Sequence, residues 1–350
     1  MSDTAGEIAG RPISNRHSSS EEASSPNDPR LGAAPNPSSS LPPSSGPSLS
    51  YELLRHSDRW IPDVLYRGCM WLGAWAALSV MPVARRNSRA YLSTVFGRPA
   101  RLSEVWRHFF AYTQMFVLRS RLAEGRPHHC KPLPSCDTLE PVLSSRRPAL
   151  LGTFHFGNSD LLGFLLSRFG GHVHMIRLRM ENSRDTHRLE DRFGKSVTFI
   201  WVNDTSNLLF AVKQAAQSGR SIAMKCDRPE HSSKVEPFQF LGQRRLFPFT
   251  IYHLAILFNL PVVFCVAAPL SENDSCLHGS PVFEPNDASK EENLERAREH
   301  FQAALAHLET LVRANPYLWF NFTPLPPAAA GISTHSRDFA QRTQDLSTRS

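Results

Sequence analysis

Apolar runs alternate with amphipathic segments from residue 148 onward. Runs of contiguous apolar residues predict strands at 149–154, 172–178, 197–202, 221–226 and 261–267. Helical spacing predicts helices after residue 160 and at 183–193, 204–218, 249–258 and 289–314. Residues 230–247 are expected to form a long loop. Strands that alternate with helices indicate an α/β fold with a mixed, mostly parallel sheet flanked by helices.

Residues 60–84 are the most apolar stretch that precedes this region. Residues 68–84 are 17 consecutive positions without a charge, at the lower limit for a membrane span. Three tryptophans in the stretch suit a membrane interface, and arginines lie on both sides of it. A buried core helix is the alternative. We expect an N-terminal apolar membrane-associated helix, and its length leaves open whether it spans the bilayer or lies in its surface.

A helical region with a short loop at its end is expected to follow. Residues 90–125 repeat apolar side chains on one helical face. His128, His129 and Cys130 come next, and their spacing matches no zinc pattern. A solvated loop is therefore favoured over a metal site there.

Composition separates a central folded part from two polar ends. Residues 1–50 are crowded with Ser and Pro, and residues 326–350 are again polar, so both are expected to be disordered. Residues 51–130 are expected to form the membrane-associated helical region. Residues 131–325 are expected to form the α/β domain, as one unit with that region.

The charge of the folded part favours an anionic partner. The formal net charge is +7, and residues 1–50 hold three arginines against five acidic residues, so the remainder carries about +9. Anionic lipid and an acidic carrier protein both fit. Nucleic acid is disfavoured, because the arginines are scattered. The six cysteines form no CxxC pair, which indicates a reduced interior, and no secretory signal is visible, so the folded part is expected to face the cytoplasm.

Candidate chemistry is concentrated after the first strand, in GTFHFGNSDLLG. His155 and Asp160 form an H-x4-D pattern at the carboxyl end of that strand, where open α/β sheets usually hold ligands. Asn158 or Ser159 is expected to cap the following helix. A histidine beside a carboxylate can remove a proton from an alcohol or amine. A capped helix that follows an ordinary histidine gives the same spacing, so the pattern alone is a weak signal.

The motifs of several other enzyme classes are missing from the sequence. No GxSxG, P-loop or GxGxxG motif is present. The sequence therefore lacks the motifs of serine esterases, P-loop nucleotide enzymes and dinucleotide-binding enzymes. A base without a protein nucleophile indicates direct transfer of an activated group to an acceptor.

The stretch GTFHFGNSDLLG resembles the signature of the lipid A biosynthesis (lauroyl/myristoyl) acyltransferases, within the wider glycerolipid acyltransferase superfamily. Four further blocks resemble that family in the same order: MIRLRMENSRDTHRLEDRFG, MKCDRPEHSSKVEPFQFLGQRRLFP, LPVVFCVAAP and NPYLWF. The likeness covers about residues 55–323. The chain carries Asp at 160 where many members carry Glu, and FNFTPLPP follows Trp319, so it resembles a divergent member.

The resemblance implies roles for particular residues. His155 would be the general base and Asp160 would orient it, with backbone N–H groups at 158–160 as donors for an oxyanion. The implied substrate-binding residues are Asn158, Arg177, Arg179, Asp227 and Arg228. Surface charge is the alternative for each arginine, and a local ion pair is the alternative for Asp227. Four phenylalanines are candidates for an acyl groove, with core packing as the default: Phe238, Phe240, Phe247 and Phe249.

The implied function is transfer of a fatty acyl group from an acyl carrier protein or CoA thioester to a hydroxyl or amine of a lipid acceptor, such as a lipid A precursor. No metal and no cofactor is expected apart from the thioester co-substrate. The expected partners include a membrane surface and no nucleic acid, and the expected location is the cytoplasmic face of the inner membrane. The alternative is a non-catalytic lipid-binding or assembly protein that keeps the fold.

Overall fold

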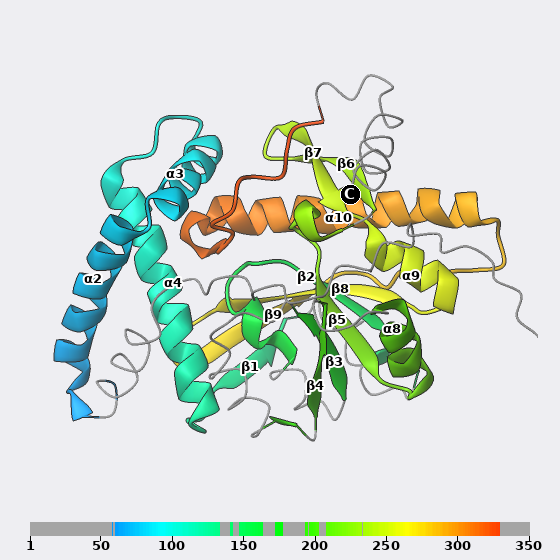
Figure 1. Ribbon diagram of the computed structural model, residues 1–350, viewed down its shortest axis with the longest axis horizontal. Helices are drawn as coiled ribbons and strands as arrows, with labels where there is room; N and C mark the ends of the chain where they lie inside the picture. Colours follow the sequence, from blue (N-terminus) through cyan, green and yellow to red (C-terminus); the bar gives the residue numbers. More distant parts are fainter. Residues whose placement is uncertain are drawn as a thin grey trace, which may run out of the picture. The chain divides into compact units, whose positions relative to one another are not determined.

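A seven-stranded sheet organises the protein, in the order β1-β9-β8-β2-β5-β3-β4 (Figure 1). The computed structural model describes residues 58, 60–133, 141–142, 147–163, 172–177, 193–194, 196–202, 208–232 and 234–329. The strands are β1 (His129–Pro132), β2 (Leu150–Thr153), β3 (Val173–Arg177), β4 (Val197–Trp201), β5 (Ser221–Lys225), β8 (Val262–Pro269) and β9 (Asp274–Gly279). Neighbours pair in parallel except β8 and β9, which are antiparallel. The predicted α/β fold with a mostly parallel sheet is confirmed.

The two strands at one edge of this sheet, β1 and β9, were not predicted. The loop expected at residues 128–130 is wrong, because His129–Pro132 pairs in parallel with β9. Both strands are polar and half exposed, so they lack the apolar run that identifies a central strand. Central strands such as β8, which is buried along seven of its eight residues, carry that signal.

Both faces of the central strands are apolar, so both faces are covered. Leu150 packs into a large cluster that includes residues of α8 (Leu208–Gln217), α9 (Thr250–Phe258) and α10 (Lys290–Ala314). Leu151, the next residue, points the other way and packs with Leu161 and Leu162, which follow β2 in the chain. A strand buried on both faces reads as a continuous apolar run, which is why the sequence reveals β2 and β8 clearly.

Two helix boundaries follow from local chemistry. The predicted capping box before α10 is confirmed: Glu292 N–H donates to Ser289 Oγ, and Ser289 N–H donates to Glu292 Oε2. Helix α9 ends at Asn259, which adopts a left-handed conformation with φ of 50°. The helix predicted at 183–193, Asp204 and the tail at 1–50 lie outside the described residues, apart from Phe193.

A β-hairpin replaces most of the loop predicted at 230–247. Strand β6 (Val235–Phe240) pairs antiparallel with β7 (Gln243–Pro248). Its two-residue turn needs positive φ at both positions, and Leu241 at 50° with Gly242 at 77° supply it. Leucine is an unusual residue for that conformation, which hid the turn in the sequence. Two backbone hydrogen bonds connect β7 with Pro327 and Ala329, at the start of the segment that the composition predicts to be a tail.

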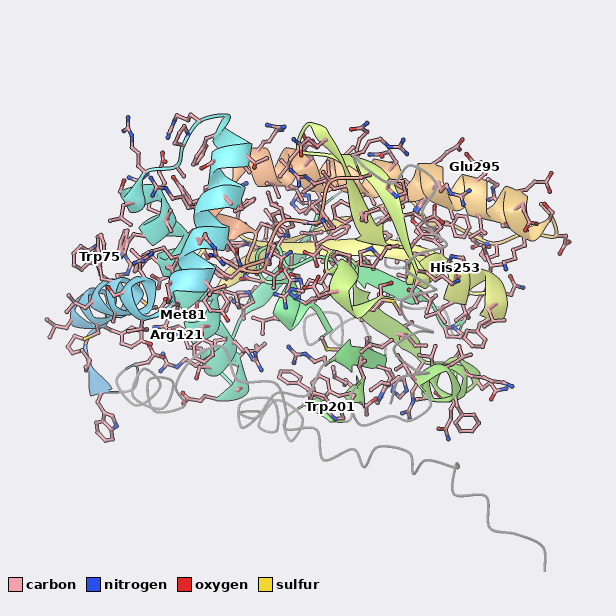
Figure 2. All side chains as sticks on the ribbon, turned by 45° about the horizontal axis from the view of Figure 1, so that its top comes forward. Trp75, Met81, Arg121, Trp201, His253 and Glu295 are labelled. Carbon is pink, nitrogen blue, oxygen red and sulfur yellow. The ribbon has the colours of Figure 1, made fainter. Side chains whose placement is uncertain are left out.

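The N-terminal apolar stretch forms two helices that pack with a third. Helix α2 (Asp63–Val80) ends before Pro82, which begins α3 (Pro82–Phe96), and α4 (Leu102–Ala123) packs against both. Met81, labelled in Figure 2, separates α2 from α3. The uninterrupted run at 68–84 is therefore divided between two helices. Among the helices that the structure describes, none has the length and apolar content needed to cross a membrane.

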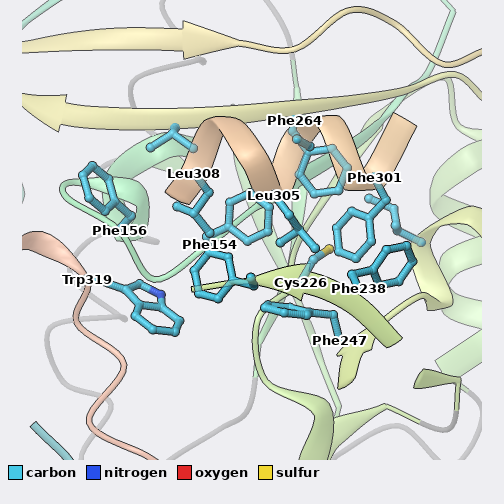
Figure 3. Packing of buried hydrophobic residues seen from close by; sticks show 14 of the residues in the cluster. Phe154, Phe156, Cys226, Phe238, Phe247, Phe264, Phe301, Leu305, Leu308 and Trp319 are labelled. Atoms are coloured by element: carbon cyan, nitrogen blue, oxygen red, sulfur yellow. The ribbon is translucent and has the colours of Figure 1, made fainter. Parts of the chain in front are cut away.

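The core beneath α10 is aromatic. Phe301 of α10 lies within 6.5 Å, between ring centroids, of Phe154 and Phe238, among others (Figure 3). All four phenylalanines considered for an acyl groove are at most 5% exposed: Phe238, Phe240, Phe247 and Phe249. They belong to the closed core, so core packing, the default interpretation, is confirmed for them.

A buried histidine connects the N-terminal helices to the C-terminal segment. His108 of α4 lies 2.8 Å from Ser88 Oγ through Nδ1 and 2.9 Å from the Trp319 carbonyl oxygen through Nε2. A carbonyl can only accept, so Nε2 carries the hydrogen and Nδ1 accepts from Ser88. Burial lowers the pKa of His108 from 6.5 to about 4, although the bond to Trp319 opposes the shift.

This histidine makes the fold sensitive to acid. The unfolded chain binds a proton near pH 6.5 and the folded chain does not until about pH 4, so stability present above pH 6.5 is lost as the pH falls. Over this pH range the free energy of unfolding should fall by up to about 3 kcal/mol. Urea unfolding at pH 7.5 and pH 4.5 measures the loss. His108→Gln, which keeps a donor for the Trp319 carbonyl, should lose less stability between these values. If the unmodified protein and His108→Gln lose the same unfolding free energy between these pH values, His108 is not the source of the acid sensitivity.

Candidate functional site

Two adjacent parallel strands bring His155 and Asp227 together. Strands β2 and β5 pair with Thr153 opposite Lys225, so their carboxyl ends meet at one edge of the sheet. The chain continues for two residues beyond each of these positions to reach His155 and Asp227. The register of one strand pair thus places a histidine beside a carboxylate that is 72 positions away in the sequence.

The Asp227 carboxylate is fully buried and accepts three hydrogen bonds. His155 Nδ1 lies 2.6 Å from Asp227 Oδ1. The backbone N–H of His155 donates to Oδ2 at 2.8 Å, and Trp319 Nε1–H donates to the same oxygen at 2.8 Å. Asp227 itself is 0% exposed, whereas the His155 side chain keeps 15% of its surface exposed. The carboxylate is a fixed internal support, and the imidazole is the part that reaches the surface.

The protonation states follow from this environment. Burial lowers the pKa of His155, the Asp227 charge opposes that shift, and the charges of Lys225 and Arg228 add to it. Burial also works to raise the pKa of Asp227, but the charge and hydrogen bonds of His155 outweigh it, so the pKa lies below its usual value. At neutral pH the carboxylate is ionised and the imidazole neutral. Since a carboxylate can only accept, Nδ1 carries the hydrogen and Nε2 has a free lone pair.

The turn at residues 155–160, here called the elbow, follows β2 and depends on Gly157, which lies against the neighbouring strand β8. Gly157 has φ of 54°, and a Cβ at this position would lie 2.4 Å from the Ala267 carbonyl oxygen of β8. Its N–H donates to the Leu318 carbonyl. The carbonyl of His155 accepts from Phe320 N–H at 2.6 Å. Leu318 and Phe320, the two neighbours of Trp319 in the chain, therefore both hydrogen-bond to the elbow.

Hydrogen bonds of Asn158 and Ser159 bear on two predictions, the oxyanion donors and the helix cap. Asn158 N–H donates to Ala267, and Ser159 N–H donates to Phe156, so these two groups are not free to stabilise an oxyanion. Neither side chain caps the short 3₁₀ turn Ser159–Leu161. Ser159 Oγ instead donates to the Phe154 carbonyl. The capping prediction is therefore wrong, and the turn is held by tertiary contacts.

Asn158 has a structural partner. Its side-chain amide donates to Ser275 Oγ at 2.7 Å, and Ser275 in turn lies 2.8 Å from His128 Nε2. His128 is buried at this point, not solvated as the sequence suggested. This buried chain of polar groups anchors the elbow to β9.

The remaining predicted site residues have different outcomes. Arg228 is half-buried beside the pair, and its Nε–H donates to Asn321 Oδ1 at 3.0 Å. Arg177 ends β3, beyond β5, where its guanidinium lies over the Phe199 ring at 5.4 Å. Arg179 and the side chain of Asp160 lie outside the described part of the chain, so the orienting role of Asp160 stays a prediction. The carboxylate that is observed on His155 Nδ1 is Asp227.

A partly apolar pocket of about 240 Å³ opens beside the elbow, between α4 and the β8–β9 turn. Its lining includes Met70, Met115, Leu118, Asn158, Leu318 and Phe320. Leu318 and Phe320 flank Trp319, so the pocket and the carboxylate are supported by the same segment. Sequence reasoning did not single out this pocket or Trp319 as part of the site, because both depend on how distant segments meet.

No protein-family model and no curated protein matches the chain. Among solved structures it is similar to the crystal structure of the 1-acyl-sn-glycerophosphate (LPA) acyltransferase, PlsC, from Thermotoga maritima. The identity is 13% and the TM-score 0.35, over 70% of this chain and 96% of that chain. A likeness of this size carries no argument about function, so the assignment rests on the site.

Gly157→Ala should destabilise the protein by about 3 kcal/mol or more, because the new methyl group combines an unfavourable φ with a clash against a backbone oxygen. Gly242→Ala is the matched control. Gly242 also has positive φ, at 77°, but no atom lies within 4 Å of its Cβ position. The control should cost about 1 kcal/mol. Urea unfolding of both variants measures the difference, and equal losses would show that the contact with β8 is not tight.

Proposed function

We propose that the protein is an acyltransferase that moves a fatty acyl group from an acyl carrier protein or CoA thioester to a hydroxyl or amine of a lipid acceptor, such as a lipid A precursor. The observation that carries the proposal is the 2.6 Å contact between His155 Nδ1 and the buried Asp227 carboxylate. It leaves a neutral imidazole, partly exposed, with its Nε2 lone pair available. The order of sequence blocks that resemble the lipid A acyltransferases supports the same reaction.

In the proposed step His155 Nε2 accepts the proton of the acceptor hydroxyl as its oxygen attacks the thioester carbonyl carbon. A tetrahedral intermediate forms, the C–S bond breaks, and the leaving thiolate takes the proton back from the imidazolium. The products are an ester and a free thiol, and His155 returns to its neutral form. Asp227 stabilises the imidazolium in between, because its negative charge lies beside Nδ1.

Cationic groups near the pair suit anionic substrates. The charges of Lys225 and Arg228 are close enough to influence the pKa of His155. Arg228 is oriented by Asn321, which is 3% exposed and also accepts from Thr323 Oγ1. We propose that Arg228 binds a phosphate of the donor or acceptor. The pocket that Met115, Leu118 and Phe320 help to line is the proposed place for an acyl chain.

The reaction is tested with purified protein, labelled acyl thioester and a lipid extract. His155→Ala should abolish acyl transfer while the protein stays folded. Asp227→Asn should lower the rate roughly 10³- to 10⁴-fold, because the wrong tautomer and an uncharged partner replace the ion pair. Asp160→Asn should give a comparable loss only if the predicted orienting role holds. Mass spectrometry of the lipids then identifies the acceptor and the chain length.

Retained turnover in folded His155→Ala protein would contradict the assigned base. If no acyl group moves from any thioester while lipid still binds tightly, the protein is a non-catalytic lipid binder. Circular dichroism of each variant is the control for folding.

We also propose that the protein works at the cytoplasmic face of the inner membrane, with helix α2 lying against the lipid. Leu65 and Leu72 are seven residues apart on one face of α2 and are 62% and 63% exposed. Trp71 and Val80 are also exposed, by 47% and 70% of their surface. Three exposed arginines follow on α3: Arg85, Arg86 and Arg89. An exposed apolar face beside basic residues suits an anionic lipid surface.

Leu72→Asp should weaken binding to vesicles that contain anionic lipid by roughly tenfold or more, since it removes buried apolar area and adds a repelled charge. Leu257→Asp is the matched control, because Leu257 is 61% exposed on α9 instead. Co-sedimentation measures the partition. Equal binding of the two variants would contradict α2 as the membrane-binding face.

A further inference from the structure

Trp319 is the third donor on the Asp227 carboxylate and is itself completely buried. Its indole N–H reaches Oδ2 at 2.8 Å, and the side chain is 0% exposed. Figure 3 shows Trp319 in the same cluster of buried residues as Phe154 and Phe156. Phe156 forms a backbone bridge to Trp319, so the residue after His155 is paired with the residue that binds Asp227.

Two aromatic rings pack against the buried indole of Trp319. The ring of Tyr91 lies 4.9 Å from it and the ring of Phe240 lies 5.5 Å from it, both edge-on. The Trp319 carbonyl accepts from His108 Nε2, and His108 is bound to Ser88. Ser88 of α3 and His108 of α4 therefore hold the backbone of Trp319, and Tyr91 of α3 and Phe240 of the hairpin hold its ring.

The two carboxylate oxygens of Asp227 accept hydrogen bonds from different donors. Oδ2 receives the Trp319 indole N–H and the His155 backbone N–H, and Oδ1 faces His155 Nδ1. Two donors on one oxygen stop the carboxylate from rotating about its Cβ–Cγ bond. Without the indole donor the carboxylate can turn away from His155, which weakens the Nδ1–H···Oδ1 bond that favours the Nδ1–H tautomer.

We propose that Trp319 is a positioning residue, whose indole N–H locks Asp227 Oδ2 so that Oδ1 keeps His155 in the Nδ1–H tautomer. The inference deepens the proposed acyl transfer and rests on it for the kinetic effect. Trp319 does not touch the reacting atoms in this account, and it acts through Asp227 alone.

The kinetic test uses Trp319→Phe, which keeps an aromatic ring and removes the donor. We expect kcat to fall roughly 10- to 100-fold, which corresponds to one hydrogen bond to a charged group, with KM changed less than about threefold. Trp106→Phe is the matched control, since the indole N–H of Trp106 is buried without a hydrogen-bond partner. That control should keep the kcat of the unmodified protein.

A double variant separates positioning from a general structural role. If Trp319 acts through Asp227, then Trp319→Phe added to Asp227→Asn should lower kcat no further than Asp227→Asn alone. Multiplied losses, or an unchanged kcat in Trp319→Phe, would overturn the proposal. If Trp319→Phe fails to fold, β-(3-benzothienyl)alanine at position 319 replaces the indole N–H by sulfur in a ring of the same shape, and the same comparisons apply.

A spectroscopic measurement keeps the inference independent of the proposed function. Nitrogen-15 NMR of labelled histidines, with His155→Ala to assign the signal, reports which ring nitrogen carries the hydrogen. We expect Nδ1–H in the unmodified protein and a mixture of tautomers once the indole donor is removed. An unchanged tautomer would overturn the proposal. If the unmodified protein transfers no acyl group, the proposed function fails, and this comparison still decides the role of Trp319.

Discussion

The burial of one carboxylate, that of Asp227, constrains most of the structure around it. An ionised carboxylate away from water is costly unless it is paired and its oxygens are hydrogen-bonded. Three donors meet that requirement, and they come from separate parts of the chain: two from His155 after β2, and one from Trp319 in the C-terminal segment. The β2–β5 register and the position of that segment are therefore required by a single buried charge.

The helices α3 and α4 are tied to the same charge. His108 joins Ser88 of α3 to the Trp319 carbonyl, and the Trp319 indole joins that carbonyl to Asp227. A continuous line of hydrogen bonds and one indole ring thus leads from the apolar N-terminal helices to the imidazole of His155. Helix α4 packs against both α2 and the segment 316–318, so α2 is connected through packing to the segment that contains Trp319.

The sequence predicted the parts of the fold whose signal is local. Continuous apolar runs gave β2, β5 and β8, and a capping box gave the start of α10. His155 was a candidate because it follows a buried strand and precedes an acid, and the family resemblance implied its role as the base. The polar edge strands β1 and β9 and the β6–β7 hairpin were missed, since edges carry few apolar residues and Leu241 is an unusual residue for a tight turn.

The identity of the carboxylate could not be read in the same way. Asp160 is close to His155 in sequence, whereas Asp227 becomes its neighbour only through the order of strands in the sheet. Sheet order depends on which strands pair, and no local pattern contains it. Trp319 was likewise visible only as a residue in a block that resembled a family. Its bond to Asp227 requires three distant segments to meet.

In the proposed mechanism His155 acts as a neutral base, which burial keeps neutral and Asp227 orients. The decisive measurement is the pH dependence of kcat/KM for acyl transfer, because this ratio reports the ionisation of the free protein. Burial lowers the pKa of His155 to about 4, so the acid limb of the profile should have an apparent pKa well below 6.5. An acid limb with an apparent pKa at or above 6.5 in folded protein would contradict a His155 base that burial keeps neutral.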